Sequence, residues 1–431
     1  MSRASLPKLR PLLLLLVAAC SSVAGEDWPG FRGRGDSRTT ARDLPLNWSD
    51  DDNLAWRVQL PGTGQSSPIL WRDTLYVTSV AGDRKERWVL QALDVATGKE
   101  RWRHTLDSAF PEALSDTRSQ AAPTPVAGPD GVFAFFESGE CLALTHAGEV
   151  RWHRVLTPEV GELANNHGLG GSPTLAGDVL VVPIDQERPS CLLALDRGSG
   201  TTRWKAPRPG RAAWSTPLVV GDAATSQVIL SGGGTVTAYR ADDGRVLWEL
   251  GGFQKNLVPS PTFGESMLVI AAGSKGSNAA FTWSGGTNAP IARWRAEDVS
   301  SGFASPLVHR GRVYFVGTAG IVNCREASTG RLLFDERVSQ SVWASPIGAE
   351  DRVYLFGEKG ATTVLAASDA FAPVATNRLT VTGKVVGVAV GDSAFFVRSQ
   401  RELHRVGARR PAPADAISSK AESGEGKATL R

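Results

Sequence analysis

The 431-residue sequence has little charge, few sulfur-containing residues and few long apolar runs. Only 21% of its residues are charged while 42% are hydrophobic, and this balance excludes a disordered chain. Four cysteines in a chain of this length exclude a small domain framed by disulfides. Glycine does not recur at every third position, so a collagen helix is excluded as well.

The motifs of common catalytic and metal sites are also missing. The six histidines are scattered, without His-Glu-x-x-His or other metal-ligand spacing. There is no Gly-x-Ser-x-Gly elbow, Walker loop, dinucleotide fingerprint or haem-attachment motif. Residues 50–53 (DDDN) begin like a calcium-binding loop but lack its Gly and distal Glu, so we expect a solvated loop. The sequence therefore predicts no catalytic residue and no metal site.

The first 20 residues are typical of an export signal. A basic start is followed by the apolar run 12–19, which is too short to span a bilayer. Residues 17–20 (VAAC) resemble a bacterial lipobox and predict lipidation of Cys20; ordinary cleavage after Ala24 is the alternative. We expect an exported protein, periplasmic or anchored in a bacterial envelope through this lipid.

The charge balance changes once this signal is set aside. The chain holds 47 Lys and Arg and 44 Asp and Glu, and the signal contributes three of the basic residues and no acid. The remainder is therefore neutral, which removes any global electrostatic case for binding nucleic acid or anionic lipid.

A repeat dominates the rest of the sequence. Ser or Thr followed by Pro recurs at intervals of 40 to 57 residues, with the prolines at positions 68, 125, 173, 217, 261, 306 and 346. A second marker, at intervals of 40 to 52 residues, ends successive units: Trp56, Trp102, Trp152, Trp204, Trp248, Trp294 and then Phe334. Two markers that keep step over this length indicate a repeat architecture.

Each unit reads as four short strands, a pattern typical of a propeller blade. Seven units are complete, and residues 385–406 supply three strands of an eighth. Residues 53–60 (NLAWRVQL) form an orphan strand before the first unit, and we expect it to complete the eighth blade and close the ring. The prediction is an all-β, eight-bladed propeller of four-stranded antiparallel blades over residues 53–407. Residues 21–52 are expected to be a flexible N-terminal extension and residues 408–431 a disordered tail.

The repeat resembles a known family. Ala92–Trp102 (ALDVATGKERW) and Ala194–Trp204 (ALDRGSGTTRW) are similar to the tryptophan-docking repeat of PQQ-dependent quinoprotein dehydrogenases, a fold shared with BamB-like envelope lipoproteins. Residues 28–33 resemble the WP-x-FRG start of secreted PQQ-like repeat proteins. The resemblance implies that the unit-ending Trp residues, and Phe334, pack between neighbouring blades.

The resemblance leaves three functions open. Quinoprotein dehydrogenases bind PQQ and usually Ca²⁺, and many members carry two adjacent cysteines, whereas Cys141, Cys191 and Cys324 are far apart here and read as buried thiols. We therefore expect no cofactor and favour a non-catalytic, monomeric, BamB-like scaffold that binds an envelope protein or peptide. A PQQ-dependent oxidoreductase or PQQ-binding protein, and a peptide- or carbohydrate-binding module, are the alternatives.

By the same resemblance, the strand after each Ser/Thr-Pro is innermost, so the residues before it converge on one mouth of the channel. They are polar, basic or aromatic: Gln65, Arg118, Gln120, Asn165, Asn166, His167, Arg211, Trp214, Lys255, Asn256, Phe303 and Trp343. A polar funnel with aromatic walls suits a polar ligand or a peptide strand. Alternatively, these side chains only cap the channel and bond to one another and to water.

Overall fold

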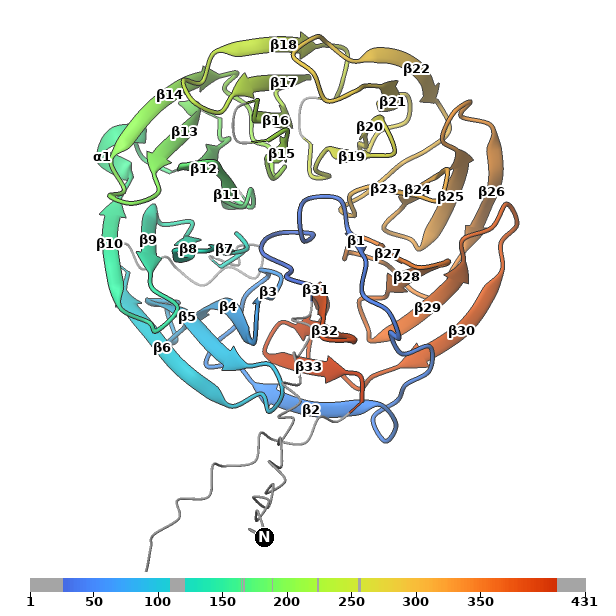
Figure 1. The fold of residues 1–431 in the computed structure, drawn as a ribbon, viewed down its shortest axis with the longest axis horizontal. Coiled ribbons are helices and arrows are strands. Elements are labelled where there is room, and N and C mark those ends of the chain that lie inside the picture. Colours follow the sequence, from blue (N-terminus) through green and yellow to red (C-terminus); the bar gives the residue numbers. More distant parts are fainter. Residues whose placement is uncertain are drawn as a thin grey trace, which may run out of the picture.

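The computed structural model describes residues 26–108, 121–163, 165, 167–187, 189–222, 225–254 and 257–408. These residues form eight β-sheets arranged as a closed ring around a central axis (Figure 1). Within this described part, the single helix is the one-turn α1 (Thr157–Val160), and no helix is long and apolar enough to cross a membrane. The predicted all-β, eight-bladed propeller is confirmed.

Blades 1 to 7 each take four consecutive strands that pair antiparallel in chain order. Blades 1 to 4 are β3 (Ile69–Trp71), β4 (Thr74–Ala81), β5 (Arg87–Asp94), β6 (Glu100–Asp107); β7 (Val126–Gly128), β8 (Gly131–Phe135), β9 (Glu140–Leu144), β10 (Val150–Val155); β11 (Thr174–Ala176), β12 (Val179–Ile184), β13 (Ser190–Asp196), β14 (Thr202–Arg208); and β15 (Leu218–Val220), β16 (Gln227–Gly232), β17 (Thr235–Arg240), β18 (Val246–Leu250).

Blades 5 to 7 are β19 (Thr262–Gly264), β20 (Met267–Ile270), β21 (Asn278–Thr282), β22 (Ile291–Ala296); β23 (Leu307–His309), β24 (Arg312–Val316), β25 (Ile321–Glu326), β26 (Leu332–Arg337); and β27 (Ile347–Ala349), β28 (Arg352–Phe356), β29 (Ala361–Ala366), β30 (Pro373–Arg378). Blade 8 holds β31 (Val385–Gly391), β32 (Ala394–Ser399) and β33 (Glu402–Val406).

The orphan strand closes the ring as predicted. Strand β2 (Leu54–Gln59) pairs antiparallel with β33 and becomes the outermost strand of blade 8. The first and last parts of the propeller are therefore held together by backbone hydrogen bonds, and no blade edge is left open at the junction.

The position of a strand within its blade explains its sequence pattern. A middle strand such as β12 is buried on both faces, because neighbouring blades cover it on either side, and it reads as a continuous apolar run. An outermost strand such as β14 alternates between buried and exposed residues, because one face meets solvent. These two patterns recur around the ring and specify which strands lie inside.

Most of the unit-ending tryptophans dock on the next blade. The indole N–H of Trp204 donates to the carbonyl of Ala241 at 2.7 Å, and Gly244, with φ of 72°, lies directly against the indole ring. A Cβ at Gly244 would come within 2.5 Å of that ring. The same indole-to-carbonyl bond joins Trp56 to Val95, Trp102 to His146, Trp152 to Arg197 and Trp294 to Ala327, at 2.8 to 3.1 Å.

Two markers depart from this arrangement. Trp248 donates to Gln227 of its own blade and packs edge-on against Trp283, with ring centres 5.6 Å apart. Phe334 packs edge-on against Phe371, also at 5.6 Å. In both cases an aromatic ring of the next blade occupies the place that a glycine turn takes elsewhere.

Candidate functional site: the two mouths of the channel

A chain of hydrogen bonds joins the blades around the channel at the Ser/Thr-Pro positions. The backbone N–H of each Ser or Thr donates to the hydroxyl oxygen of its counterpart in the next blade at 2.9 or 3.0 Å. The series runs Ser67, Thr124, Ser172, Thr216, Ser260, Ser305, Ser345. Only a hydroxyl side chain serves as this acceptor at so short a reach, which explains the restriction to Ser and Thr.

Blade 8 interrupts this chain because its corresponding residue is Gly387. A Cβ at this position would lie 2.2 Å from the hydroxyl oxygen of Ser67. The glycine therefore lets the last blade and the first approach closely at the point where the ring closes.

The N-terminal segment crosses one mouth of the channel (Figure 1). We call residues 26–52 the strap. Trp28 exchanges two backbone hydrogen bonds of 2.9 Å with Leu70 in β3, the innermost strand of blade 1. Further along, β1 (Arg38–Thr39) pairs parallel with β27, the innermost strand of blade 7. The prediction of a flexible extension is wrong for this segment, because backbone pairing at Trp28 and again at β1 fixes its course across the ring.

Arg32 is a buried, charged side chain of the strap. Its guanidinium donates to the hydroxyls of Ser37 and Thr262, at 2.9 and 2.6 Å, and to the carbonyl of Pro306 at 2.9 Å. Burial lowers the pKa of Arg32 to about 10, so the group still carries its charge at neutral pH. A buried cation held by neutral oxygens thus pins the strap to the walls of blades 5 and 6.

The strap leaves little space in the channel behind it. A hollow of about 50 Å³ remains, with Trp28, Phe31 and Arg32 on one side and Phe303 and Trp343 on the other. At the far end the strap is anchored by Trp48, whose ring packs against aromatic rings of blades 7 and 8. This mouth of the channel is consequently plugged by the protein's own chain.

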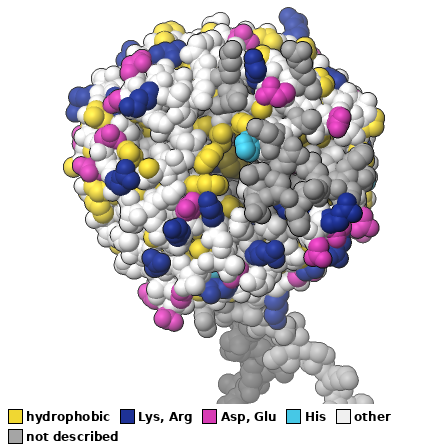
Figure 2. Space-filling model, turned by 180° about the vertical axis from the view of Figure 1, so that it is seen from behind, with side chains coloured by type: hydrophobic (Ala, Val, Ile, Leu, Met, Phe, Trp, Pro, Cys, Tyr) yellow, Lys and Arg dark blue, Asp and Glu magenta, His cyan; other side chains and the backbone are white. Residues whose placement is uncertain are grey.

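The opposite, open mouth is built by the loops that precede the innermost strands, where the predicted funnel residues lie. Figure 2 shows this face, with hydrophobic side chains gathered around a central hollow and Lys and Arg at its border. Phe303, which is 44% exposed, packs against Trp343 with ring centres 4.7 Å apart. His167 and Trp214 form a second pair at 5.9 Å. The structure therefore brings the predicted aromatic residues together as two ring pairs.

The other funnel residues are placed individually. Asn165 is buried, with its side-chain amide 3.5 Å from the carbonyl of Asp185. Gln65 is half-buried, and exposed Arg211 lies 3.8 Å from the carboxylate of Glu187. The predicted funnel residues Arg118, Gln120, Asn166, Lys255 and Asn256, and the lipidation site Cys20, lie outside the described residues.

Two features of the open mouth escaped sequence reasoning. The ammonium of Lys384 lies 4.0 Å from the centre of the Trp343 ring, a cation–π contact from a loop of blade 8. Below the mouth, Arg208 makes a bidentate ion pair with Asp185 at 2.7 and 3.1 Å and donates to the hydroxyl of Tyr239. No local sequence signal reports either contact, because each joins strands or loops from different parts of the chain.

The buried pair holds the base of the loop that carries Trp214. Arg208 is the last residue of β14, just before that loop. Burial alone would lower the pKa of Arg208, but the adjacent Asp185 carboxylate raises it above its ordinary value. The bidentate contact therefore fixes the base of the loop on a rigid support.

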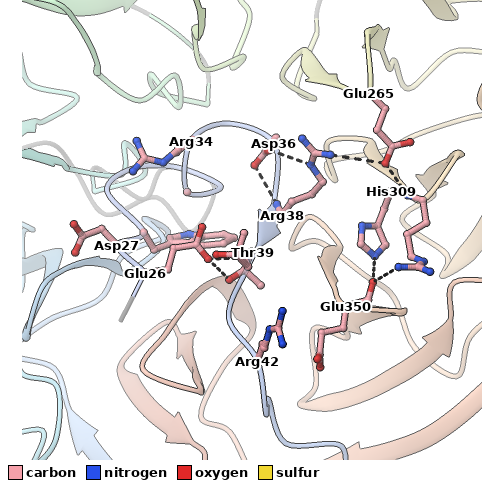
Figure 3. Close-up of a pocket in the computed structure, with 14 residues that line it drawn as sticks. Glu26, Asp27, Arg34, Asp36, Arg38, Thr39, Arg42, Glu265, His309 and Glu350 are labelled. Carbon is pink, nitrogen blue, oxygen red and sulfur yellow. Dashed lines mark hydrogen bonds and ion pairs between the residues drawn. The ribbon is translucent and has the colours of Figure 1, made fainter. Parts of the chain in front are cut away.

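A larger hollow lies on the strap side of the ring (Figure 3). We call it the strap pocket. It has a volume of about 770 Å³ and is lined by the strap between Glu26 and Arg42 and by the turns at Glu265, Arg310 and Glu350. The sequence predicted a site only at the other mouth, since the residues of this pocket come together only through the course of the strap.

The hollow in the channel is small compared with a site for a cofactor such as PQQ. The 50 Å³ hollow is far below the roughly 300 Å³ at which small-molecule sites begin. In the described part of the chain, no group of three or more His, Cys, Asp or Glu residues is placed to hold a metal. Cys141, Cys191 and Cys324 are free and buried, and burial raises the pKa of Cys141 to about 12.

Together, the ring and its docked tryptophans define a class of repeat propellers in which neighbouring blades are joined by contacts between a Trp and a glycine turn. The family described as "Outer membrane protein assembly factor BamB" matches residues 39–182, 159–289 and 283–372. The protein therefore belongs to this PQQ-like repeat family. A comparison with curated proteins gives no match.

Solved structures agree with this fold. BamB from Moraxella catarrhalis is 17% identical, with a TM-score of 0.61, over 82% of this chain and 96% of that one. The quinohemoprotein alcohol dehydrogenase from Comamonas testosteroni is 12% identical, with a TM-score of 0.64, over 90% and 82%. The computationally designed Ika8 protein is 12% identical, with a TM-score of 0.57, over 81% and 100%. At these identities the likeness concerns the fold alone.

Proposed function

We propose that this protein is a non-catalytic scaffold of the cell envelope that binds a segment of a partner protein at its open mouth. The observation that carries the proposal is the contact of exposed Phe303 with half-buried Trp343, two rings that line the channel hollow. Exposed aromatic side chains on rigid supports are the usual anchors of protein interfaces. Membership of the BamB family supports the same reading.

The plugged channel supports binding from one side. Because the strap fills the other mouth, a partner segment that enters at Phe303 and Trp343 meets Arg32 and Trp28 at the bottom of the hollow. A partner therefore lies across the open mouth and inserts a side chain at most. This geometry favours recognition of a surface segment over a threaded chain.

A photo-crosslinking residue placed at position 303 in the native envelope tests the proposal. We expect one defined partner to be crosslinked, and we expect Trp214→Ala combined with Trp343→Ala to abolish the product while the protein stays folded. Ile291, which is 72% exposed on the outer strand β22, is the matched control position and should give no such product. The same product from both positions, or one that survives the double replacement, would contradict partner binding at the open mouth.

Titration with PQQ and Ca²⁺ tests the competing function. We expect no quinone binding, because the channel hollow is too small. A tight PQQ complex that oxidises alcohols with an artificial electron acceptor would overturn the scaffold proposal in favour of an oxidoreductase.

The envelope location is part of the proposal and is tested separately. We expect the protein to be exported and acylated at Cys20. The intact mass of the membrane-extracted protein should show the acyl chains, and Cys20→Ala should move the protein to the soluble fraction. An unacylated mass would instead favour ordinary signal cleavage.

A further inference from the structure

The strap pocket is separate from the open mouth and is rich in charge (Figure 3). Most of its carboxylates already accept hydrogen bonds or form ion pairs within the protein. Glu26 accepts hydrogen bonds from the hydroxyl of Thr39 and the backbone N–H of Thr40, both at 2.6 Å. Asp27 accepts a hydrogen bond from the backbone N–H of Arg72. These two carboxylates are thus already satisfied by the protein.

Two further carboxylates of the pocket are also engaged. Glu265 accepts hydrogen bonds of 2.7 Å from both backbone N–H groups of residues 310–311. Asp36 binds the guanidinium of Arg38 at 3.1 Å, and Arg38 also lies 3.8 Å from Glu265. These acidic side chains therefore mainly hold the strap and the blade turns in place through hydrogen bonds and ion pairs.

The cations of the pocket are less fully used. Arg34 and Arg42 are exposed, and neither makes an ion pair or a side-chain hydrogen bond with any residue in the described ranges. Among the residues that the structure describes, the guanidinium of Arg310 donates to the carbonyl of Glu350 alone, at 3.4 Å. An unpaired guanidinium that lines a concave site is a ready donor for a carboxylate or phosphate group.

We propose that the strap pocket binds an organic anion with more than one carboxylate or phosphate group, with Arg42 as the principal contact and Arg34 as a second contact. The volume of about 770 Å³ lies within the range of small-ligand sites. The carboxylate of Glu350 points away from His309 in Figure 3 and forms no ion pair with a residue in the described part of the chain. It opposes the bound anion and sets the selectivity of the pocket by repulsion.

Calorimetric titration of the mature protein at low ionic strength, with citrate and with inorganic pyrophosphate as probes, tests this site. We expect binding that Arg42→Ala weakens about tenfold, the loss of one charge-assisted contact. Glu350→Gln should strengthen it, because a like charge is removed. Comparison of the two probes shows whether the pocket prefers carboxylate or phosphate groups.

The matched control is Arg337→Ala, since Arg337 is also exposed but lies on the outer strand β26. Its replacement should leave binding unchanged. The proposal is overturned if neither probe binds, or if Arg42→Ala and Arg337→Ala have equal effects. Because the probes bind on the face opposite to Phe303, the outcome is independent of partner binding at the open mouth.

Discussion

The two mouths of the channel are covered by different parts of the protein. The strap mouth is covered by backbone, which pairs with the innermost strands of blades 1 and 7 and sends Arg32 into the channel. The open mouth is covered by side chains, and its aromatic pairs leave part of their surface to solvent. Backbone pairing saturates hydrogen bonds and stabilises the ring, whereas exposed rings stay available to a partner. Under the proposed function, the protein partner therefore binds on one face, while the backbone pairing of the strap stabilises the other.

Both mouths of the channel exist only while the ring is closed. Opening the ring should therefore have the largest effect on both of them. Deletion of residues 53–60 removes β2 and exposes the edge of β33. We expect loss of the cooperative unfolding transition, as measured by thermal denaturation followed by circular dichroism. A deleted protein that melts like the full chain would show that closure by β2 is dispensable.

The support of the open mouth is expected to be the next most sensitive point. Asp185→Asn leaves the buried Arg208 without its counter-charge and should cost about 3–5 kcal/mol in the free energy of unfolding. Chemical denaturation measures the change. The matched control is Asp185→Asn combined with Arg208→Met, which removes both charges and should recover part of the loss. No recovery would mean that the pair acts through hydrogen bonds rather than charge.

The strap should contribute to the stability of the protein without contributing to partner binding at the open mouth. Arg32→Met keeps the length of the side chain but removes its hydrogen bonds to Thr262 and Pro306, at an expected cost of about 2 kcal/mol. Crosslinking at position 303 should be unchanged in this variant. A variant of wild-type stability that loses its crosslinked partner would reverse the roles assigned to the two mouths.

The strap mouth should also respond to acid. Burial is the main cause that lowers the pKa of His309, with Arg38 and Arg310 adding to it and Glu265 and the carbonyl of Glu350 opposing it. The unfolded chain therefore takes up this proton at a higher pH than the folded one. Stability is fully present above the ordinary histidine pKa of about 6.5 and falls below it, by at most about 1.4 kcal/mol per pH unit.

Thermal denaturation between pH 7.5 and 5 measures this effect, and His309→Gln should flatten the slope. His104 and His404 also have a pKa lowered chiefly by burial, so a residual slope is expected in the variant. An unchanged slope would exclude His309 as a source of the acid sensitivity.

The hydroxyl chain around the channel should give the smallest effect. Ser260→Ala removes the acceptor for the backbone N–H of Thr216 and should cost about 1 kcal/mol. Ser260→Thr keeps the hydroxyl and is the matched control, since Thr already occupies two positions of the series. Equal stability of the two variants would show that the motif serves the strand start rather than the contact between blades.

The architecture of the ring was accessible from sequence because its signals are local and repeated. The Ser/Thr-Pro pairs and the Trp residues each mark a unit of similar length, and Trp56 indicates the closing strand β2. The exceptions were not accessible. Trp248 looks like the other docking residues, yet its acceptor lies in its own blade, because Trp283 of the next blade fills the docking place.

The candidate sites were only partly accessible. Phe303 and Trp343 were predicted to be mouth residues because each precedes an innermost strand, but their ring contact and the contact of Lys384 depend on three different loops. The strap pocket was missed altogether. Its lining brings residues 26–42 together with turns more than two hundred residues away, and no periodicity relates them.

The number of blades, the order of the strands and the way in which the ring closes follow from the sequence alone, because short-range patterns of apolar, turn and docking residues specify them. Which mouth is open depends on the folded ring. The N-terminal segment has no repeat to follow, and its course is set by long-range hydrogen bonds such as that from Arg32 to Pro306. Such bonds form only once the blades have placed their carbonyl and hydroxyl groups around the channel, so the plugged face and its pocket are properties of the assembled ring.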